Sequence, residues 1–485
     1  MSGEVGFVRN VRGPVAYLDG LPDISVGEMV SSASGARGFV GSLHDDVAEV
    51  FLLSDQAVSP GEMFTRTGEL LDIPVGDFLL GRSINPVGDP VDGKGKLAIG
   101  KNAVRMSLDE PAVGIAGRRF ISEQFDTGIG VIDTIFPIGK GQRELIIGEQ
   151  RSGKTQFLLD IIANLRGSGM ICVYAIIGKP VVETRDIWLQ LTENKLLDNT
   201  VLVMSIAADP APLTFLAPQT AMTVAQYFQR QGKDVLIILD DMGVAARNYR
   251  EMALVSNRPP GRESYPGDIF YQQARLLERA GCFNPTAGSG SITALPVVEL
   301  VLAEFSAFIP TNLMGMTDGH ILFKAALSQQ GTRPAVDRFL SVTRVGSQTQ
   351  QRLQNALAMR LKETLARGAQ LEVVSRFGSE LPAETRAALL ARQQVEELLN
   401  QKPFVKISKE VQTVMFALPF SSFLKGKTAA FVKDIKPKLL AAFTTDPQLI
   451  EFAKQVFTKK DLAELFAAVE TIVPVLSKYV SNQPN

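Results

Sequence analysis

The chain has 485 residues, which at about 150 residues per domain predicts about three domains. Lys and Arg total 50 and Asp and Glu total 51, so the net charge of −1 argues against binding nucleic acid or acidic lipid by bulk charge. Hydrophobic residues make up 45% and charged residues 21%, which is typical of a folded globular chain and excludes a disordered one. Any anion that this protein binds must therefore be bound locally.

Residues 1–73 predict a small β-barrel. Short β-like runs at residues 6–8, 15–18 and 47–53 are separated by turns containing Gly, Asp and Ser-Gly. Closely spaced short strands of this kind, with no helical segment between them, favour an all-β domain.

Residues 74–350 predict an α/β domain, and residues 351–485 predict a helical bundle. In the central segment, apolar strand cores such as residues 144–147, 170–177 and 235–239 are followed by helical stretches. Strands that alternate with helices favour a parallel sheet with crossover helices. In the last segment the Gly and Pro content falls and apolar residues recur at helical spacing.

The longest stretch without charge does not predict a membrane span. Residues 210–229 contain three prolines and several Gln and Thr residues, which an apolar spanning helix would not. If the protein works at a membrane, we expect it to do so as a peripheral subunit.

A phosphate-binding loop is the most specific motif. The strand at residues 144–147 leads into G-x-x-x-x-G-K-[ST] and then into a helical run at residues 156–162, which is the order the motif requires. The loop residues are Gly148, Glu149, Gln150, Arg151, Ser152, Gly153, Lys154 and Thr155. The glycines allow backbone N–H groups to converge on phosphate, Lys154 adds a charge for the outer phosphates, and Thr155 offers its hydroxyl to Mg²⁺.

A second carboxylate is expected at the same edge of the sheet. The apolar run at residues 235–239 ends at Asp240, which we expect to be a water-mediated partner of Mg²⁺. An apolar run that ends in Asp is weak evidence alone, but it gains weight beside the loop. The loop and this aspartate thus predict bound phosphate groups together with Mg²⁺.

At this point the chain resembles the α subunit of F-type ATP synthases. The matching segments occur in the family's order from roughly residue 5 to the early C-terminal helices and thin out beyond about Lys402; they are residues 136–148, 258–268, 291–296, 309–312, 317–319, 333–335 and 341–347. The resemblance implies a β-barrel, a RecA-like P-loop nucleotide-binding domain and a helical domain, which is the division that the sequence pattern predicts.

The resemblance also implies partners and a location. Three such subunits would alternate with three catalytic β subunits around a central-stalk γ subunit, peripheral on an energy-transducing membrane. That membrane would be the bacterial plasma membrane on its cytoplasmic side or, as the alternative, the mitochondrial inner membrane on its matrix side. Membrane contact would occur only through the complex, and no nucleic acid is expected. Whether a peripheral-stalk subunit is also a partner stays open, because the sequence before Val5 lacks the longer N-terminal helix with which family members contact that stalk.

Lys179 bears on whether this chain hydrolyses ATP. Hydrolysis needs a carboxylate on the strand after the P-loop helix to orient water. Catalytic β subunits of the family place Glu there and α subunits usually Gln, whereas this sequence has Lys179, which cannot act as a base while charged. We therefore expect ATP binding without turnover. Glu183 is the rival candidate base.

Arg344 is the expected catalytic contribution to a neighbour. It lies in Ser-Val-Thr-Arg-Val-Gly-Ser, and the resemblance implies that its guanidinium reaches the catalytic site of the adjacent β subunit. Such arginine fingers are worth roughly 10³–10⁵ in rate. The alternative is an ordinary interface arginine.

The resemblance implies adenine contacts at Arg333, Pro334 and Gln401. Pro403 stands where a second family glutamine would be, so adenine specificity is less firmly implied than phosphate binding.

Two other functions remain open. A self-sufficient hexameric ATPase would need its own base, such as Glu183. An RNA translocase would need a basic, aromatic-rich barrel, and residues 1–73 are not basic.

Overall fold

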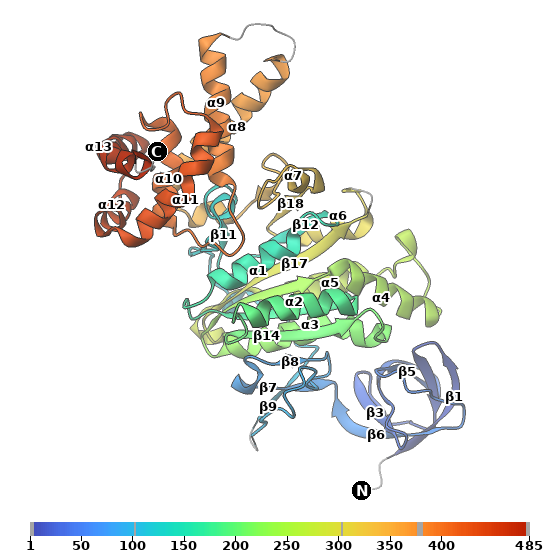
Figure 1. The fold of residues 1–485 in the computed structure, drawn as a ribbon. Coiled ribbons are helices and arrows are strands. Elements are labelled where there is room, and N and C mark those ends of the chain that lie inside the picture. Colours follow the sequence, from blue (N-terminus) through green and yellow to red (C-terminus); the bar gives the residue numbers. More distant parts are fainter. Residues whose placement is uncertain (1–3, 101–102, 302–303, 376–381, 482–485) are drawn as a thin grey trace. The chain divides into compact units, whose positions relative to one another are not determined.

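The computed structural model describes residues 4–100, 103–301, 304–375 and 382–481 of the chain. Two compact units are present, and each is assembled from segments distant in sequence. The first comprises Met1–Phe120, Lys140–Gln150 and Arg166–His320, and the second comprises Ile121–Gly139, Arg151–Leu165 and Ile321–Asn485. Figure 1 shows the ribbon coloured along the sequence.

The first unit begins with a closed six-stranded barrel, whose strands follow one another around it in the order β1-β2-β5-β4-β3-β6. The strands are β1 (Val5–Arg12), β2 (Val15–Asp19), β3 (Glu28–Ser32), β4 (Arg37–His44), β5 (Val47–Leu52) and β6 (Met63–Leu70). Alternate side chains point inward, so Val8, Leu18, Val50 and Phe64 meet in a buried core. The antiparallel pairing of β1 with β6 closes the barrel.

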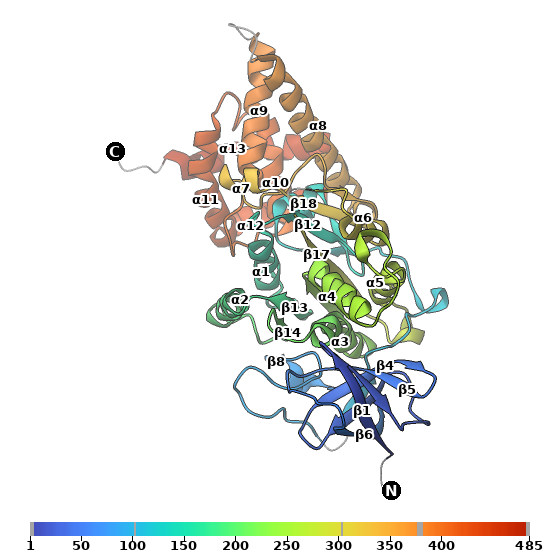
Figure 2. The ribbon, with the colours of Figure 1, turned by 90° about the vertical axis from the view of Figure 1, so that its right-hand side faces the viewer.

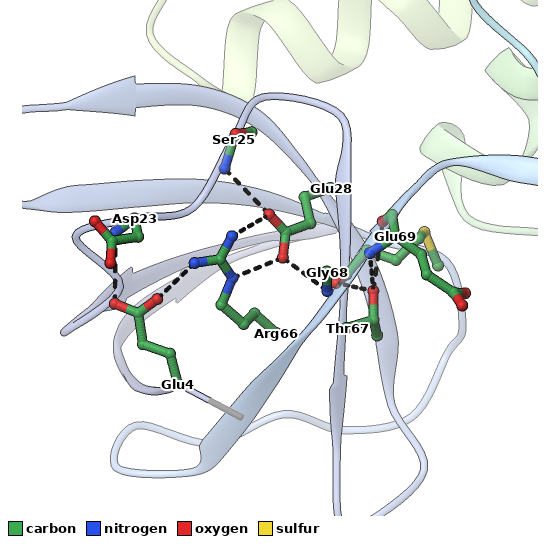
Figure 3. A network of polar contacts seen from close by, with 9 residues as sticks. Glu4, Asp23, Ser25, Glu28, Arg66, Thr67, Gly68 and Glu69 are labelled. Atoms are coloured by element: carbon green, nitrogen blue, oxygen red, sulfur yellow. Dashed lines mark hydrogen bonds and ion pairs between the residues drawn. The ribbon is translucent and has the colours of Figure 1, made fainter. Parts of the chain in front are cut away.

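A partly buried ion-pair network joins three parts of this barrel (Figure 3). The Arg66 guanidinium donates two hydrogen bonds of 2.8 Å to the Glu28 carboxylate, and a third of 2.8 Å to Glu4. The backbone N–H groups of Ser25 and Gly68 also donate to Glu28. The hydrogen bonds from Arg66 hold the pKa of Glu28 below its ordinary value although burial opposes this shift. The network ties Glu4, which precedes β1, to β3 and β6.

The same unit contains a sheet that runs in the order β12-β17-β15-β13-β14-β8, with all neighbours parallel. Its strands are β8 (Ser83–Ile84), β12 (Leu145–Glu149), β13 (Ile171–Lys179), β14 (Thr200–Ile206), β15 (Asp234–Asp240) and β17 (Ser291–Leu300), with β16 (Gly281–Cys282) antiparallel to β17. The central strands are buried almost throughout, which explains their continuous apolar runs. A small separate sheet pairs β7 (Asp72–Val75) with β9 (Val104–Ser107).

Helices of the first unit pack on this sheet or, in the case of α5, on the helices that cover it (Figure 2). They are α2 (Val181–Glu193), α3 (Ala211–Arg230), α4 (Met242–Val255), α5 (Ile269–Leu277) and α6 (Phe308–Met316), with short turns η1 (Asp77–Leu79), η2 (Ile115–Gly117), η4 (Arg262–Ser264) and η5 (Pro285–Ala287). The barrel contacts this layer through an apolar cluster in which Val15 and Phe51 meet Ala211 and Met252.

The second unit is mainly helical, and α8 and α9 run side by side in it (Figure 2). Its helices are α1 (Lys154–Asn164), α7 (Ala325–Gln329), α8 (Arg352–Ser375), α9 (Ala383–Leu399), α10 (Lys409–Ala417), α11 (Ala429–Thr445), α12 (Pro447–Phe457) and α13 (Leu462–Ser481). The shorter elements are β10 (Gln124–Phe125), η3 (Val131–Ile135), β11 (Ile138–Gly139), β18 (Gly319–Phe323, which begins in the first unit), β19 (Val342–Thr343), η6 (Gly346–Thr349) and η7 (Leu418–Phe420).

The predicted fold class is confirmed: an N-terminal barrel, an α/β domain with a parallel sheet and a C-terminal helical domain are all present. The domain boundaries at residues 73 and 350 stay a prediction. In the described ranges, none of the helices combines the length and apolar character needed to cross a membrane.

Candidate nucleotide-binding site

The phosphate-binding loop connects β12 to α1. Gly148 and Glu149 end β12 in the sheet of the first unit, and Gln150 follows them, whereas α1 begins at Lys154 in the second unit. Gly153 is the N-cap of α1 with φ of 92°, a left-handed conformation that glycine adopts without strain. Arg151 is also left-handed, with φ of 59°, which the sequence did not indicate. Within the described chain, no side chain caps α1, so its first N–H groups suit an anion.

Contacts within the second unit fix the phosphate-loop helix. The Phe157 ring packs on Phe323 with ring centroids 5.1 Å apart. Asp160 Oδ1 accepts a hydrogen bond of 2.9 Å from the Phe404 N–H. The Lys406 ammonium donates to the Asn164 carbonyl over 2.7 Å. The segment around residues 404–406 therefore lies along α1. The sequence did not indicate this contact, because the two segments are about 240 residues apart in the chain.

The structure brings together the three residues predicted to lie near adenine, because the Gln401 N–H donates to the Arg333 carbonyl over 2.6 Å and Pro334 follows directly. The Gln401 side chain is buried and holds the backbone: its oxygen accepts from the Gly130 N–H at 2.9 Å, and its nitrogen donates to the Gly128 carbonyl at 2.8 Å. Gln401 thus orders this corner of the second unit, and its contact with adenine stays a prediction.

At the carboxyl edge of the sheet in the first unit, Asp240 forms a triad with Tyr174 and Lys179. The Tyr174 hydroxyl donates to Asp240 Oδ2 over 2.8 Å, and the Lys179 ammonium lies 3.0 Å from Asp240 Oδ1. Side-chain exposure is only 15% for Lys179 and 4% for Asp240. Burial opposes the charged amine, but the Asp240 carboxylate outweighs it, so the pKa of Lys179 is raised and the ammonium persists at neutral pH.

The adjacent Asp241 has a structural role. It is the N-cap of α4 and accepts from the N–H groups of Gly243 and Val244, while its other oxygen accepts from the Glu299 N–H at 2.8 Å. Burial, followed by the neighbouring Asp240 carboxylate, raises the pKa of Asp241. Of the two aspartates, only Asp240 faces Lys179 at ion-pair distance among the described contacts.

The triad does not fit a divalent cation held through Asp240. Each oxygen of Asp240 already has a hydrogen-bonding partner, and the ammonium of Lys179 would repel a second cation beside it. Thr155 lies in the first turn of α1 and belongs to the second unit, whereas Asp240 belongs to the first unit. The contacts of Asp240 therefore speak against its predicted role toward Mg²⁺, and the predicted role of Thr155 stays a prediction.

Glu183, the rival base, lies in the first turn of α2 and is exposed. Lys179 instead ends β13, where the register with β14 shifts after Ile176. An exposed carboxylate on a helix surface is the ordinary position of a glutamate. The role of Tyr174 in holding Asp240 was missed from the sequence, where Tyr174 is one apolar strand residue among many.

Arg344 lies in an exposed loop of the second unit between β19 and η6. The Thr343 hydroxyl donates to the Pro137 carbonyl over 2.9 Å and accepts from the Gly346 N–H at 3.2 Å. A Cβ at Gly346 would lie 1.6 Å from the Pro137 oxygen, so only glycine fits. The loop is therefore held on both sides of Arg344.

Two matches to known families agree with this architecture. Residues 128–343, which include the phosphate loop, Lys179, Asp240 and Arg333, match the nucleotide-binding domain of the ATP synthase alpha/beta family. Residues 350–472 match the C-terminal domain of the ATP synthase alpha/beta chain. Together the two matches cover well over half of the chain. They include the phosphate loop, most of the parallel sheet and most of the C-terminal helices. The chain therefore belongs to the ATP synthase alpha/beta family.

Proposed function

We propose that this chain is the regulatory, non-catalytic α subunit of the soluble head of an F-type ATP synthase. It binds ATP at its own phosphate loop and supplies Arg344 to the catalytic site of an adjacent β subunit. Mg²⁺ that arrives on the phosphates of ATP would have the Thr155 hydroxyl as its ligand from this chain. The complex would couple ATP synthesis or hydrolysis to ion translocation, with a γ subunit in its central stalk, at an energy-transducing membrane.

The observation that carries the proposal is the ion pair of Lys179 with Asp240. The residue that ends β13 stands where the resemblance places the catalytic glutamate of β subunits. Its ammonium is 3.0 Å from Asp240 and its pKa is raised, by Asp240 against the effect of burial, so it stays protonated. A protonated amine cannot accept a proton from the attacking water. This supports binding without turnover.

The phosphate loop can be tested with the purified chain. We expect ATP to bind and steady-state hydrolysis to be negligible, measured by equilibrium dialysis and by phosphate release. Lys154→Ala should weaken binding because it removes the charge for the outer phosphates. Lys454→Ala, an exposed lysine in α12 of the same unit, should bind as the unchanged chain does.

Steady hydrolysis by the purified chain alone would overturn the proposal. If Glu183→Gln then abolished that hydrolysis, the chain would be a self-sufficient ATPase with Glu183 as its base. A chain that binds single-stranded RNA on a filter would instead favour a translocase.

A further inference from the structure

The feature behind this inference is a buried lysine of the second unit, Lys436 in the middle of α11. The residue is only 7% exposed. Its ammonium donates to the backbone carbonyls of Glu397 at 3.2 Å, Leu398 at 2.7 Å and Asn400. An ammonium has three N–H donors, so these three acceptors use all of them. The side chain of Lys436 therefore joins α11 to the last turn of α9.

The acceptors lie at the C-terminal end of α9, where backbone carbonyls lack partners within the helix. The Asn400 N–H closes the helix by donating to the carbonyls of Glu396 and Glu397. The carbonyls of Leu398 and Asn400 lie beyond this bond and accept from Lys436. A cation is favourable there because a helix C-terminus carries partial negative charge. Burial lowers the pKa of Lys436 to about 8 although the Glu397 carboxylate opposes this shift, so the ammonium predominates at pH 7.

Lys436 holds the point at which α9 ends and residues 400–406, here called the supporting segment, begin. Asn400 Oδ1 accepts from the Arg333 N–H at 2.9 Å, and the Gln401 N–H donates to the Arg333 carbonyl over 2.6 Å. The Gln401 side chain also contacts the backbone of the segment before the phosphate loop. The end of α9 thus orders the corner that contains Arg333 and Gln401.

The supporting segment then reaches the phosphate-loop helix α1. The Gln401 amide donates to the Val405 carbonyl, which closes a short loop. The residues on either side of Val405 contact α1 along its second half, one at the Asp160 carboxylate and the other at the Asn164 carbonyl. Because α1 is held at these two points, a shift of the supporting segment would move the helix. The N–H groups that suit phosphate lie at the first turn of that helix.

We propose that Lys436 is a positioning residue for the bound nucleotide, because it fixes the end of α9 and thereby the supporting segment that holds the phosphate-loop helix. The inference deepens the proposed function and rests on it, since the nucleotide is the one bound at that loop. Lys436 acts through these backbone contacts and not by touching ATP. The C-terminal helices would in this way set the affinity of the phosphate loop, through contacts that all lie within the second unit.

The test measures the dissociation constant of ATP by equilibrium dialysis and the free energy of unfolding in urea, on the purified full-length chain at pH 7. Lys436→Met keeps an unbranched side chain of similar size and removes every donor. It should weaken ATP binding by at least about fivefold, the lower end of the usual coupling between separate sites. Lys436→Arg, which keeps the charge and the N–H donors, should recover most of that affinity.

Two control variants separate positioning from stability. Gln394→Met removes another buried donor of α9, whose amide donates to the carbonyls of Leu424 and Lys427 at 2.7 Å, outside the supporting segment. It should lower the free energy of unfolding, as Lys436→Met does, but leave the dissociation constant of ATP unchanged. Lys438→Met removes an exposed lysine of α11 and should change neither quantity.

Each outcome has a separate meaning. Unchanged ATP affinity of Lys436→Met would overturn this inference and leave the proposed function intact, because the lysine would then only cap α9. An equal loss of affinity in Gln394→Met would also overturn it, since any destabilised helical domain would then bind ATP less tightly. Absence of ATP binding by the unchanged chain, with the fold intact by circular dichroism, would overturn the proposed function and the inference together.

Hydrogen exchange on the unchanged chain provides a second measurement if Lys436→Met does not fold. Coupling between two sites is reciprocal, so ATP at the phosphate loop should stabilise the supporting segment. ATP should therefore slow exchange of the backbone N–H groups of Asn400, Gln401 and Phe404 as well as of those at the start of α1. Slower exchange confined to the phosphate loop and α1 would overturn the inference.

Discussion

The Gln412 amide donates to Asp133 Oδ2 over 2.9 Å, across 279 residues of sequence. The same carboxylate accepts from the N–H and the hydroxyl of Thr127 at 2.8 and 2.6 Å, and from the Gly128 N–H at 2.8 Å. Four donors thus converge on one buried carboxylate. Asp133 lies in η3 and Gln412 lies in α10, so this carboxylate links the two elements. The segment before the phosphate loop is thereby held against the C-terminal helices of the second unit.

Asp133→Asn should destabilise the protein by roughly 3 kcal/mol, because the new amide group would face donors and leave buried groups unpaired. Unfolding in urea would measure this loss. Asp126→Asn is the matched control, since Asp126 lies beside the same carboxylate but its own ion pair, with Lys409, is half-exposed. Its expected cost is below about 1 kcal/mol. Equal effects of the two substitutions would contradict the importance of the four donors.

The Arg82–Asp92 pair should make stability depend on acid pH. Arg82 contacts both oxygens of Asp92, at 2.7 and 3.0 Å, and the Asp92 side chain is 1% exposed. Burial acts to raise the pKa of Asp92, but Arg82 and two backbone N–H groups outweigh it and lower the pKa to about 2. Because the folded pKa lies below the unfolded one, this contribution is complete above about pH 4 and is lost as the pH falls toward 2.

Asp92→Asn should accordingly cost roughly 2 kcal/mol at neutral pH and flatten the dependence of unfolding free energy on pH between about 4 and 2. Chemical unfolding at several pH values would show it. Asp109→Asn, which removes an exposed partner of Arg275, should leave that dependence in place. A pH profile of Asp92→Asn parallel to that of the unchanged chain would refute the assignment.

Gly346→Ala should impair the loop that carries Arg344. The added methyl would collide with the Pro137 carbonyl, so the loop must move and Arg344 with it. In a complex assembled with catalytic partners, ATP hydrolysis should fall at least tenfold while ATP binding to this chain persists. Gly315→Ala in helix α6 is the control, because a Cβ there would meet none of the other described residues within 4 Å beyond its chain neighbours and the backbone of its own helix. Full activity of the Gly346→Ala complex would show that the loop tolerates displacement.

Arg344→Ala should lower hydrolysis by the assembled complex by roughly 10³–10⁵, the usual contribution of an arginine finger. Arg344→Lys should recover little, because a lysine lacks the planar fork of donors. Arg9→Ala, which removes an exposed arginine of the barrel, should leave the rate unchanged. The measurement is steady-state phosphate release by complexes of equal subunit content. A loss below about tenfold for Arg344→Ala would favour an ordinary interface arginine.

Local sequence patterns were sufficient for the barrel, the parallel sheet and the position of the phosphate loop. Each depends on periodicity or on a motif with near neighbours, as in the run from Leu145 to Lys154. The triad of Tyr174, Lys179 and Asp240 depends instead on strand register and on a shift near Gly178, which sequence spacing does not encode. The same is true of Gln401, whose side chain holds Gly128 and Gly130 from about 270 residues away.

The contact of Arg66 with Glu4 and Glu28 has a consequence for synthesis of the chain. Because β1 pairs with β6, the barrel cannot close on the ribosome until the sixth strand has emerged, and the ion pairs of Arg66 form only then. The first strands must wait with an unpaired edge, since their closing contacts span about 60 residues of sequence. The ion pairs of Arg66 therefore form only when nearly the whole barrel, through Leu70 of β6, has been synthesised.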